Sequence, residues 1–174
     1  DRSGSRGITK LQDSSGLVEA IEDAKAQGFE KEALVEEFAT GQEYSIECVS
    51  WKGKHHFLAM THKFTTGAPH FIETGHMEPA PISQEQLEQV KKVVFHALDS
   101  LEITYGASHT ELKIAKDGTI ALIEIGGRMG GDFIGSNLVQ LSTGIDFVKA
   151  VIDISLGEEP DLELGDHAAA GVRF

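Results

Sequence analysis

An α+β fold, with antiparallel sheets flanked by helices, is the fold class that the sequence predicts. Two pairs of strand-like segments are each joined by a short glycine turn, at Lys52-Gly53 and at Asp117-Gly118, and such turns are typical of antiparallel hairpins. Between the two hairpins, apolar residues at helical spacing follow Ser83. Hairpins that alternate with a helix of this kind favour an antiparallel sheet covered by helices.

The first elements expected are a helix and three strands. Ser14 can cap a helix whose apolar positions recur at helical spacing, and Gly28 can end it. Residues 33–38, 43–51 and 54–63 then predict strands, the second of which alternates strongly. Residues 65–81 are rich in glycine, proline and polar side chains, so we expect a long loop with a functional role there.

The second half of the chain predicts further helices and strands. Ser83 and Gln86 form a capping-box pattern, and the apolar stripe behind them runs to Leu101. Strands are expected over residues 105–114, 119–125 and 170–174, and helices over 134–141 and 146–156. The last of these helices has two candidate caps, Thr143 and Asp146.

Charge and composition exclude several classes of function. Fifteen Lys and Arg residues stand against 28 Asp and Glu residues, which gives a formal charge of -13 and argues against general binding to nucleic acid or to membrane surfaces. No apolar run approaches the roughly 20 residues needed to span a bilayer, and the start of the chain has no signal-peptide core. A cytoplasmic protein is therefore expected, with Cys48 as a buried, inert thiol.

Two glutamates are predicted to meet across the second hairpin. If Asp117-Gly118 is a two-residue turn, Lys116 pairs with Thr119, Ile114 with Ala121 and Leu112 with Ile123, and Glu111 then faces Glu124. Directly opposed residues have Cβ atoms about 4.5–5.5 Å apart, so like charges repel unless a cation lies between them. Magnesium, which prefers oxygen ligands, is one interpretation, and a solvent-facing pair that splays apart is the other.

Neighbouring segments favour a phosphate site. Glu124 is followed by Gly126-Gly127-Arg128 and Gly130-Gly131-Asp132, where small residues allow a ligand to approach the backbone and Arg128 supplies a cation. Glu43 and Glu47 point to the same face of their strand, either into a cleft or into solvent. The opening Ser3-Gly-Ser-Arg-Gly7 is typical of a phosphate-covering loop, although such runs are also common in linkers.

Taken in order, these motifs resemble the ATP-grasp superfamily. The resemblance rests on four segments: Ser3 to Gly7, Val35-Glu-Glu-Phe-Ala39 with Gly41-Gln-Glu-Tyr-Ser45, Glu111, and Glu124-Ile-Gly-Gly-Arg128. It is strongest to amino-acid ligases and related carboxylate–amine ligases, through residues 63–73 and the small residues after Glu124. It implies an incomplete ATP-grasp fold, with a small lid lobe over residues 1–64 and a large lobe over 65–174.

The resemblance also implies a role for each motif. A mobile lid over the phosphates of ATP would comprise Ser3, Gly4, Ser5, Arg6 and Gly7. The hinge that binds adenine would comprise Glu36, Glu37, Phe38 and Ala39. Glu43 would hold the ribose, Glu111 and Glu124 would bind Mg²⁺, and Arg128 would stabilise the acyl-phosphate. Candidates for substrate contact are His70, Glu73 and His76.

Two departures from the family pattern are visible. Many relatives have asparagine two residues after the second metal-binding glutamate, where this sequence has Gly126, so the number of metal ions is open. The lysines that relatives use on ATP would precede residue 1, and both ends of the sequence look truncated. We therefore expect a part of a longer enzyme, without its N-terminal lobe and inactive on its own.

The implied activity is ATP-dependent formation of an amide or peptide-like bond through an acyl-phosphate. The partners implied are a small-molecule carboxylate and an amine, with no nucleic acid and no membrane, and the sequence leaves open whether the full-length enzyme is a homo-oligomer. Alternatives are a carboxylase of the same superfamily, a noncatalytic nucleotide-binding module and a structural α+β domain without a ligand.

Overall fold

The computed structural model describes residues 7–67 and 72–174 of the chain, which form two units. The first unit consists of the described parts of residues 1–39 and 65–72, and the second of residues 40–64 and 73–174.

The first unit contains one helix, α1 (Leu17–Gln27), within its described residues. The helix starts after Gly16, which has a φ of 78° and gives no side-chain cap, so the prediction that Ser14 caps it is wrong. Gly28 ends it as predicted, with its N–H donating to the Ala24 carbonyl at 3.1 Å. Residues 33–38 form no strand, and their apolar side chains such as Leu34 are exposed, because an alternating segment needs a neighbouring strand to pair with.

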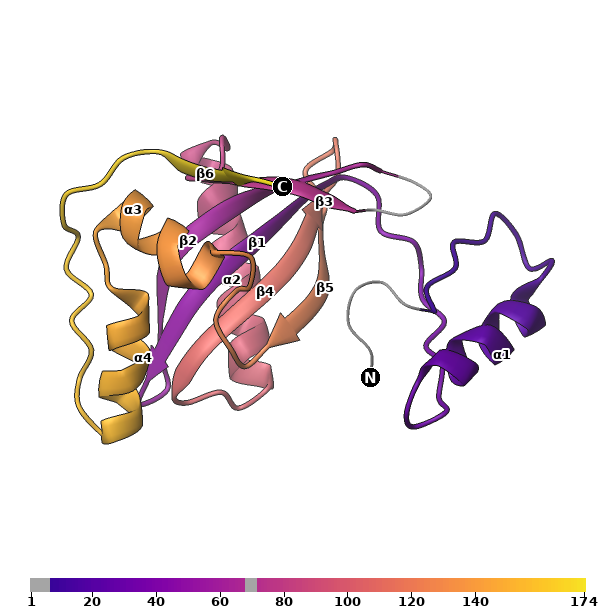
Figure 1. The fold of residues 1–174 in the computed structure, drawn as a ribbon, viewed down its shortest axis with the longest axis horizontal. Coiled ribbons are helices and arrows are strands. Elements are labelled where there is room, and N and C mark those ends of the chain that lie inside the picture. Colours follow the sequence, from indigo (N-terminus) through magenta and orange to yellow (C-terminus); the bar gives the residue numbers. More distant parts are fainter. Residues whose placement is uncertain (1–6, 68–71) are drawn as a thin grey trace. The chain divides into compact units, whose positions relative to one another are not determined.

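The second unit is built on one six-stranded sheet in the order β5-β4-β1-β2-β3-β6 (Figure 1). Its strands are β1 (Gln42–Trp51), β2 (Lys54–Thr65), β3 (Glu73–Glu78), β4 (Gly106–Ile114), β5 (Ile120–Gly126) and β6 (Ala170–Arg173). The pairs β1–β2, β1–β4, β4–β5 and β3–β6 are antiparallel. The turn at Lys52-Gly53, with φ values of 52° and 76°, is the expected tight hairpin.

Strand β3 corrects one prediction. Residues 73–78 lie inside the segment expected to be a loop, yet they pair with β6, with Gly75 opposite Arg173. The glycine and proline content of residues 65–81 obscured a short strand whose partner lies almost 100 positions further along the chain.

Helices cover both faces of the sheet, which confirms the α+β class (Figure 1). Helix α2 (Gln84–Ser100) packs Val90, Val94 and Leu98 against one face, and the Ser83 side chain caps it by accepting from the Gln86 N–H. Helices α3 (Val139–Thr143) and α4 (Phe147–Leu156) pack on the other face. They bury residues such as Val139 and Phe147 against Val49.

The segment before α4 is less regular than predicted. Instead of one helix over residues 134–141, the chain forms a π-helical turn, η1 (Ile134–Leu138), followed by α3. Of the two candidate caps for α4, Asp146 is the one used, and its side chain accepts from the Lys149 N–H at 2.9 Å. π-Helical turns occur frequently at functional sites.

The β4–β5 connection differs from the predicted two-residue turn. The Ala115 N–H donates to the Thr119 carbonyl, and Ile114 pairs with Ile120 rather than with Ala121. A bulge next to Glu111 then shifts the register back by one residue, so Leu112 pairs with Leu122 rather than Ile123. Because the two shifts cancel, Glu111 still lies opposite Glu124.

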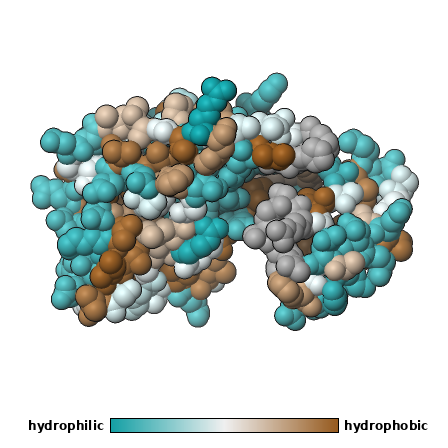
Figure 2. Space-filling view, in the orientation of Figure 1, coloured by the Kyte–Doolittle hydropathy of each residue, from teal (hydrophilic) through white to brown (hydrophobic). Residues whose placement is uncertain are grey.

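Polar side chains cover much of the surface shown in Figure 2. An apolar band follows α4, on which Val148, Ile152 and Leu156 are exposed at four-residue spacing. No helix in the described part of the chain is long and apolar enough to cross a membrane.

Candidate functional site

One face of β1 is polar over its first half. On its other face, Tyr44, Ile46 and Cys48 belong to the core cluster that contains Val90, Val94 and Leu98 of α2. Burial raises the pKa of the Cys48 thiol, which fits the expected inert residue. Glu43 and Glu47 contact side chains of the neighbouring strands on the opposite face, where they begin a network of buried charges.

Lys63 on β2 is the centre of this network. Its side chain is 3% exposed, and its Nζ lies 2.7 Å from Glu111 Oε1, 2.6 Å from Glu73 Oε1 and 3.3 Å from Glu43 Oε1. Burial alone would lower the pKa of Lys63, but Glu111 and Glu73 outweigh it and raise that pKa above its ordinary value. One buried ammonium group therefore joins carboxylates from β1, β3 and β4.

Glu111 and Glu124 meet across β4 and β5, as the sequence predicts. Glu111 is partly buried, and its Oε1 accepts hydrogen bonds from Lys63 Nζ and, at 3.3 Å, from His109 Nε2. Hydrogen bonding from His109, together with Lys63, holds the pKa of Glu111 at about 2 although burial opposes this. Glu124 is exposed, and its carboxylate makes no hydrogen bond or ion pair with another residue of the described chain.

The buried pair Glu47 and His109 lies next to Glu111 and contacts it through the His109 ring. Glu47 is fully buried, and its Oε1 is hydrogen-bonded to His109 Nδ1. Desolvation lowers the pKa of His109, but Glu111 and Glu47 outweigh it and raise that pKa to about 9, so His109 is a cation at neutral pH. The other oxygen of Glu47 accepts from the Gly130 N–H at 2.9 Å. Glu47 thus links the strand of Glu111 to the loop that follows β5.

That loop carries Arg128 and depends on its glycines. A Cβ on Gly130 would lie 2.7 Å from Glu47 Oε1 and 3.0 Å from His109 Nδ1, so only glycine allows this approach. Arg128 is exposed, and its Nη1 donates to the Met129 carbonyl at 2.9 Å. The loop therefore presents a guanidinium group at the end of the strand that carries Glu124.

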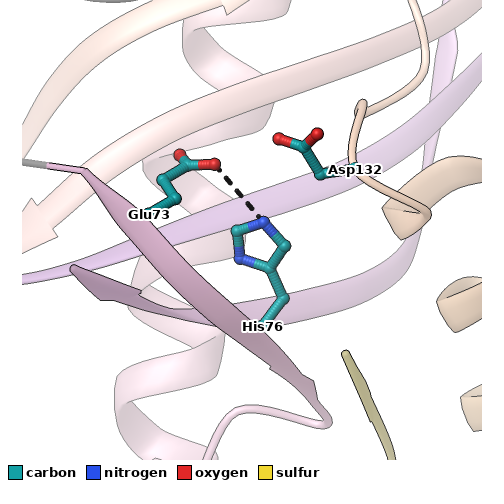
Figure 3. Close-up of side chains that lie close together, drawn as sticks. All are labelled: Glu73, His76 and Asp132. Atoms are coloured by element: carbon teal, nitrogen blue, oxygen red, sulfur yellow. Dashed lines mark ion pairs between the residues drawn. The ribbon is translucent and has the colours of Figure 1, made fainter. Parts of the chain in front are cut away.

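A second cluster lies beside this network, at Glu73, His76 and Asp132 (Figure 3). One ligand atom from each residue lies within 4.8 Å of the others. His76 Nε2 is 3.4 Å from Glu73 Oε2, and interaction with His76, together with Lys63, lowers the pKa of Glu73 to about 2 against the effect of burial. Glu73 and His76 are two of the three predicted substrate contacts.

The predicted nucleotide contacts fall mostly outside the sheet. Ser3, Gly4, Ser5 and Arg6 of the predicted lid lie outside the described residues, as does His70. Gly7 packs closely on α1 with a φ of 69°. In the predicted hinge, Glu36 and Glu37 are exposed, and the Phe38 ring has Lys10 Nζ 3.6 Å from its centroid. Gly7 and residues 36–39 belong to the first unit, whereas Glu43 belongs to the second.

Three residues of the site were not identified from the sequence. Lys63 lies one position beyond the pair Tyr44–His62, so correct registration of β1 against β2 would have placed it opposite Glu43. His109 precedes Glu111 by two positions on one strand, and the two-residue period already places both on one face. Asp132 gave no such signal, because its position depends on the path of an irregular loop.

The donor set at Glu111 and Glu124 fits magnesium. Both residues offer carboxylate oxygens, the ligands that Mg²⁺ prefers, and Mg²⁺ is usually held by one or two carboxylates with phosphate oxygens and water. The described contacts of Glu111 all go to Oε1, so its Oε2 is available for a metal ion. Glu124 offers an exposed carboxylate directly opposite.

Comparison with known proteins supports the resemblance to the ATP-grasp superfamily. Residues 1–136 match the model of the ATP-grasp domain. Over 85% of its length, the chain is 27% identical to alanine–anticapsin ligase from Bacillus subtilis, and over 78% it is 28% identical to human carnosine synthase 1. It covers 34% and 16% of those proteins, so it spans about a third of their length or less.

Solved structures show the same fold. L-Amino acid ligase from Bacillus licheniformis superimposes with a TM-score of 0.67 and 34% identity, over 77% of this chain and 35% of that chain. Biotin carboxylase from Campylobacter jejuni gives a TM-score of 0.81 over 97% of this chain and 39% of that chain, but at 14% identity it shows the fold alone. With a family match that covers most of its length, the chain belongs to the ATP-grasp family.

Proposed function

We propose that this chain is the ATP- and Mg²⁺-binding part of a carboxylate–amine ligase that forms an amide or peptide-like bond through an acyl-phosphate. The observation that carries the proposal is the opposed pair Glu111 and Glu124, followed directly by the loop of Arg128. The names of relatives such as alanine–anticapsin ligase and L-amino acid ligase favour a ligase. The likeness to biotin carboxylase extends to the fold alone and does not favour a carboxylase.

The nucleotide contacts proposed for this chain are those that the family resemblance implies. Ser3 to Gly7 would cover the phosphates, residues 36–39 would hold adenine, and Glu43 would bind the ribose. Magnesium held by Glu111 and Glu124 would neutralise charge on the ATP phosphates during transfer to the substrate carboxylate. The lobes proposed for this arrangement are residues 1–64 and 65–174, and the proposed location is the cytoplasm.

The buried network fixes the direction of Glu111. Lys63 and His109 both bind its Oε1, which leaves Oε2 to face a ligand. Partners of this kind, which orient a metal-binding carboxylate, contribute strongly to metal affinity. Because Glu47 contacts both His109 and the Gly130 N–H, the same network fixes the position of the loop that carries Arg128 relative to Glu111.

Arg128 is proposed to stabilise the phosphoryl group as it moves to the substrate. Its guanidinium is exposed and always charged, and the loop anchored at Gly130 limits where it can reach. Preorganised cations that face developing negative charge are a main source of rate enhancement in phosphoryl transfer. His70, Glu73 and His76 are proposed as substrate contacts, and the substrates as a small carboxylic acid and an amine.

An ADP-release assay on the complete protein tests this function. Amino acids would be supplied singly and in pairs, with ATP and Mg²⁺. The ligase predicts ADP formation that requires both an acid and an amine, and stoichiometric formation of their amide. ADP formation that requires bicarbonate would indicate a carboxylase, and ATP binding without ADP under any condition would indicate a noncatalytic module.

A further inference from the structure

Glu73, His76 and Asp132 form a cup of ligand atoms that shares no residue with the Glu111–Glu124 pair, although Lys63 contacts both Glu73 and Glu111. Glu73 and His76 come from β3, and Asp132 comes from the loop after β5. Figure 3 shows the three side chains converging from these two segments, with the His76 ring below the two carboxylates. The set offers one imidazole nitrogen and two carboxylate oxygens, all within 4.8 Å of one another.

His76 is the unusual member of the cup. The residue is 2% exposed, and within the described chain neither ring nitrogen has a hydrogen-bond partner. Burial of a polar group without a partner is unfavourable, so native proteins seldom leave one without a ligand, water or ion. The contact that Nε2 makes is an ion pair with Glu73 Oε2 at 3.4 Å, a separation longer than a normal hydrogen bond, and Nδ1 has no polar partner within the described chain.

That separation suits a shared metal ion. Two ligands at about 2.1 Å from a tetrahedral ion are about 3.4 Å apart. Glu73 is held for this role because Lys63 Nζ binds its other oxygen, Oε1, at 2.6 Å and leaves Oε2 facing the ring. The partner that orients the carboxylate is thus already in place.

Asp132 supplies the exposed side of the cup. Its φ of 49° lies in the left-handed region, which aspartate tolerates but which remains sparsely populated outside glycine. The next residue, Phe133, also has a positive φ, of 67°, so the loop makes a tight bend where it brings Asp132 toward His76. Within the described chain no hydrogen bond or ion pair engages the Asp132 carboxylate.

We propose that Glu73, His76 and Asp132 bind a divalent metal ion of the zinc type, with a coordination position open to the substrate. An imidazole ligand favours zinc, cobalt or nickel over magnesium, and two carboxylates balance the charge of the ion. Three protein ligands with one open position are typical of zinc sites that meet a substrate. This inference deepens the proposed function, because the substrate contact proposed for Glu73 and His76 would then pass through the ion.

The test measures metal uptake by this chain and its variants. Metal-free protein is dialysed against equimolar Zn²⁺, uptake is measured by elemental analysis, and Co²⁺ is added separately so that its visible absorption reports ligand geometry. Asp132→Asn removes one ligand charge but keeps a residue that tolerates positive φ. Asp23→Asn, which alters an exposed aspartate on α1, is the matched control.

We expect one Zn²⁺ per chain in the wild type and in Asp23→Asn. The affinity for Zn²⁺ should be at least about tenfold lower in Asp132→Asn, since even loss of a residue that only orients a metal ligand has that effect. The Co²⁺ spectrum should change with Asp132→Asn and not with Asp23→Asn. Absence of Zn²⁺ uptake, or equal uptake by all three proteins, would overturn the metal site. A shift of the His76 ring resonances with methylamine, without Zn²⁺ uptake, would also overturn it while leaving the proposed ligase function intact.

Discussion

Replacement of Glu47 by glutamine should destabilise the second unit far more than the same change at Glu78. Both glutamates are fully buried on the same sheet, but their partners differ. Glu47 accepts from protonated His109 and from the Gly130 N–H, neither of which can reverse its role. Glu78 accepts from the hydroxyls of Thr61 at 2.6 Å and Ser142 at 2.8 Å, and hydroxyls can also accept from an amide.

The magnitude follows from these partners. Removal of one member of a buried ion pair costs about 3–5 kcal/mol, and the remaining glutamine oxygen recovers about 1 kcal/mol by serving one donor. We therefore expect Glu47→Gln to lower the free energy of unfolding by about 2–4 kcal/mol, and Glu78→Gln by about 1 kcal/mol or less. For a chain of this size, each kcal/mol lowers Tm by about 2–4 °C.

Urea unfolding followed by tryptophan fluorescence measures this difference. Trp51 is the single tryptophan, it is 8% exposed, and it belongs to the same unit as both glutamates. Equal losses in the two variants would refute the reasoning, because they would mean that burial alone, and not the His109 and Gly130 contacts, sets the cost.

Three further predictions concern the same network. The pKa of His109 is raised to about 9 in the folded protein. Protonated His109 therefore stabilises the fold fully below about pH 6.5, and this stabilisation is lost as the pH rises through 9. The free energy of unfolding measured between these pH values should fall, and it should fall less in Glu47→Gln. Gly130→Ala places a Cβ within 3.0 Å of three neighbouring atoms and should lower the free energy of unfolding by about 1–3 kcal/mol. Gly131→Ala places its Cβ where no atom lies within 4 Å, so it should change Tm little. Similar Tm values for the two variants would contradict the packing argument. Lys63→Met leaves three carboxylates without their shared cation. It should lower Tm most at neutral pH and least near pH 3, where protonation of the carboxylates relieves their repulsion. A decrease in Tm that does not depend on pH would exclude the electrostatic role of Lys63.

Local patterns in the sequence predicted most of the second unit because its signals are short-range. Alternation in residues 43–51, the Lys52-Gly53 turn and the Ser83 cap each depend on neighbours within a few positions. Strand β3 could not be predicted in this way, since it depends on β6, almost 100 residues further on. The strand expected over residues 33–38 failed for the opposite reason, because local pattern was present and a partner was not.

The Glu111–Glu124 pairing was predicted through a turn that the protein does not have. The connection at residues 115–119 and the bulge beside Glu111 shift the register in opposite directions, and neither leaves a clear local signal. The network around Lys63 was inaccessible for a related reason, since it joins four strands whose mutual order no short segment specifies. Chemistry could be predicted strand by strand, but the charge balance between strands required the structure.

Nucleotide-dependent uptake of Mn²⁺ by the complete protein tests the role of Glu111 and Glu124 most directly, because Mn²⁺ can replace Mg²⁺ at oxygen ligands and is visible by electron paramagnetic resonance. Wild-type protein should bind Mn²⁺ tightly only when ATP is present, and Glu124→Gln should weaken that binding at least about tenfold. Glu163→Gln, at an exposed glutamate outside the site, serves as the control and should bind as the wild type does. Binding of Mn²⁺ and ATP that is unchanged in Glu124→Gln would contradict the proposed magnesium site.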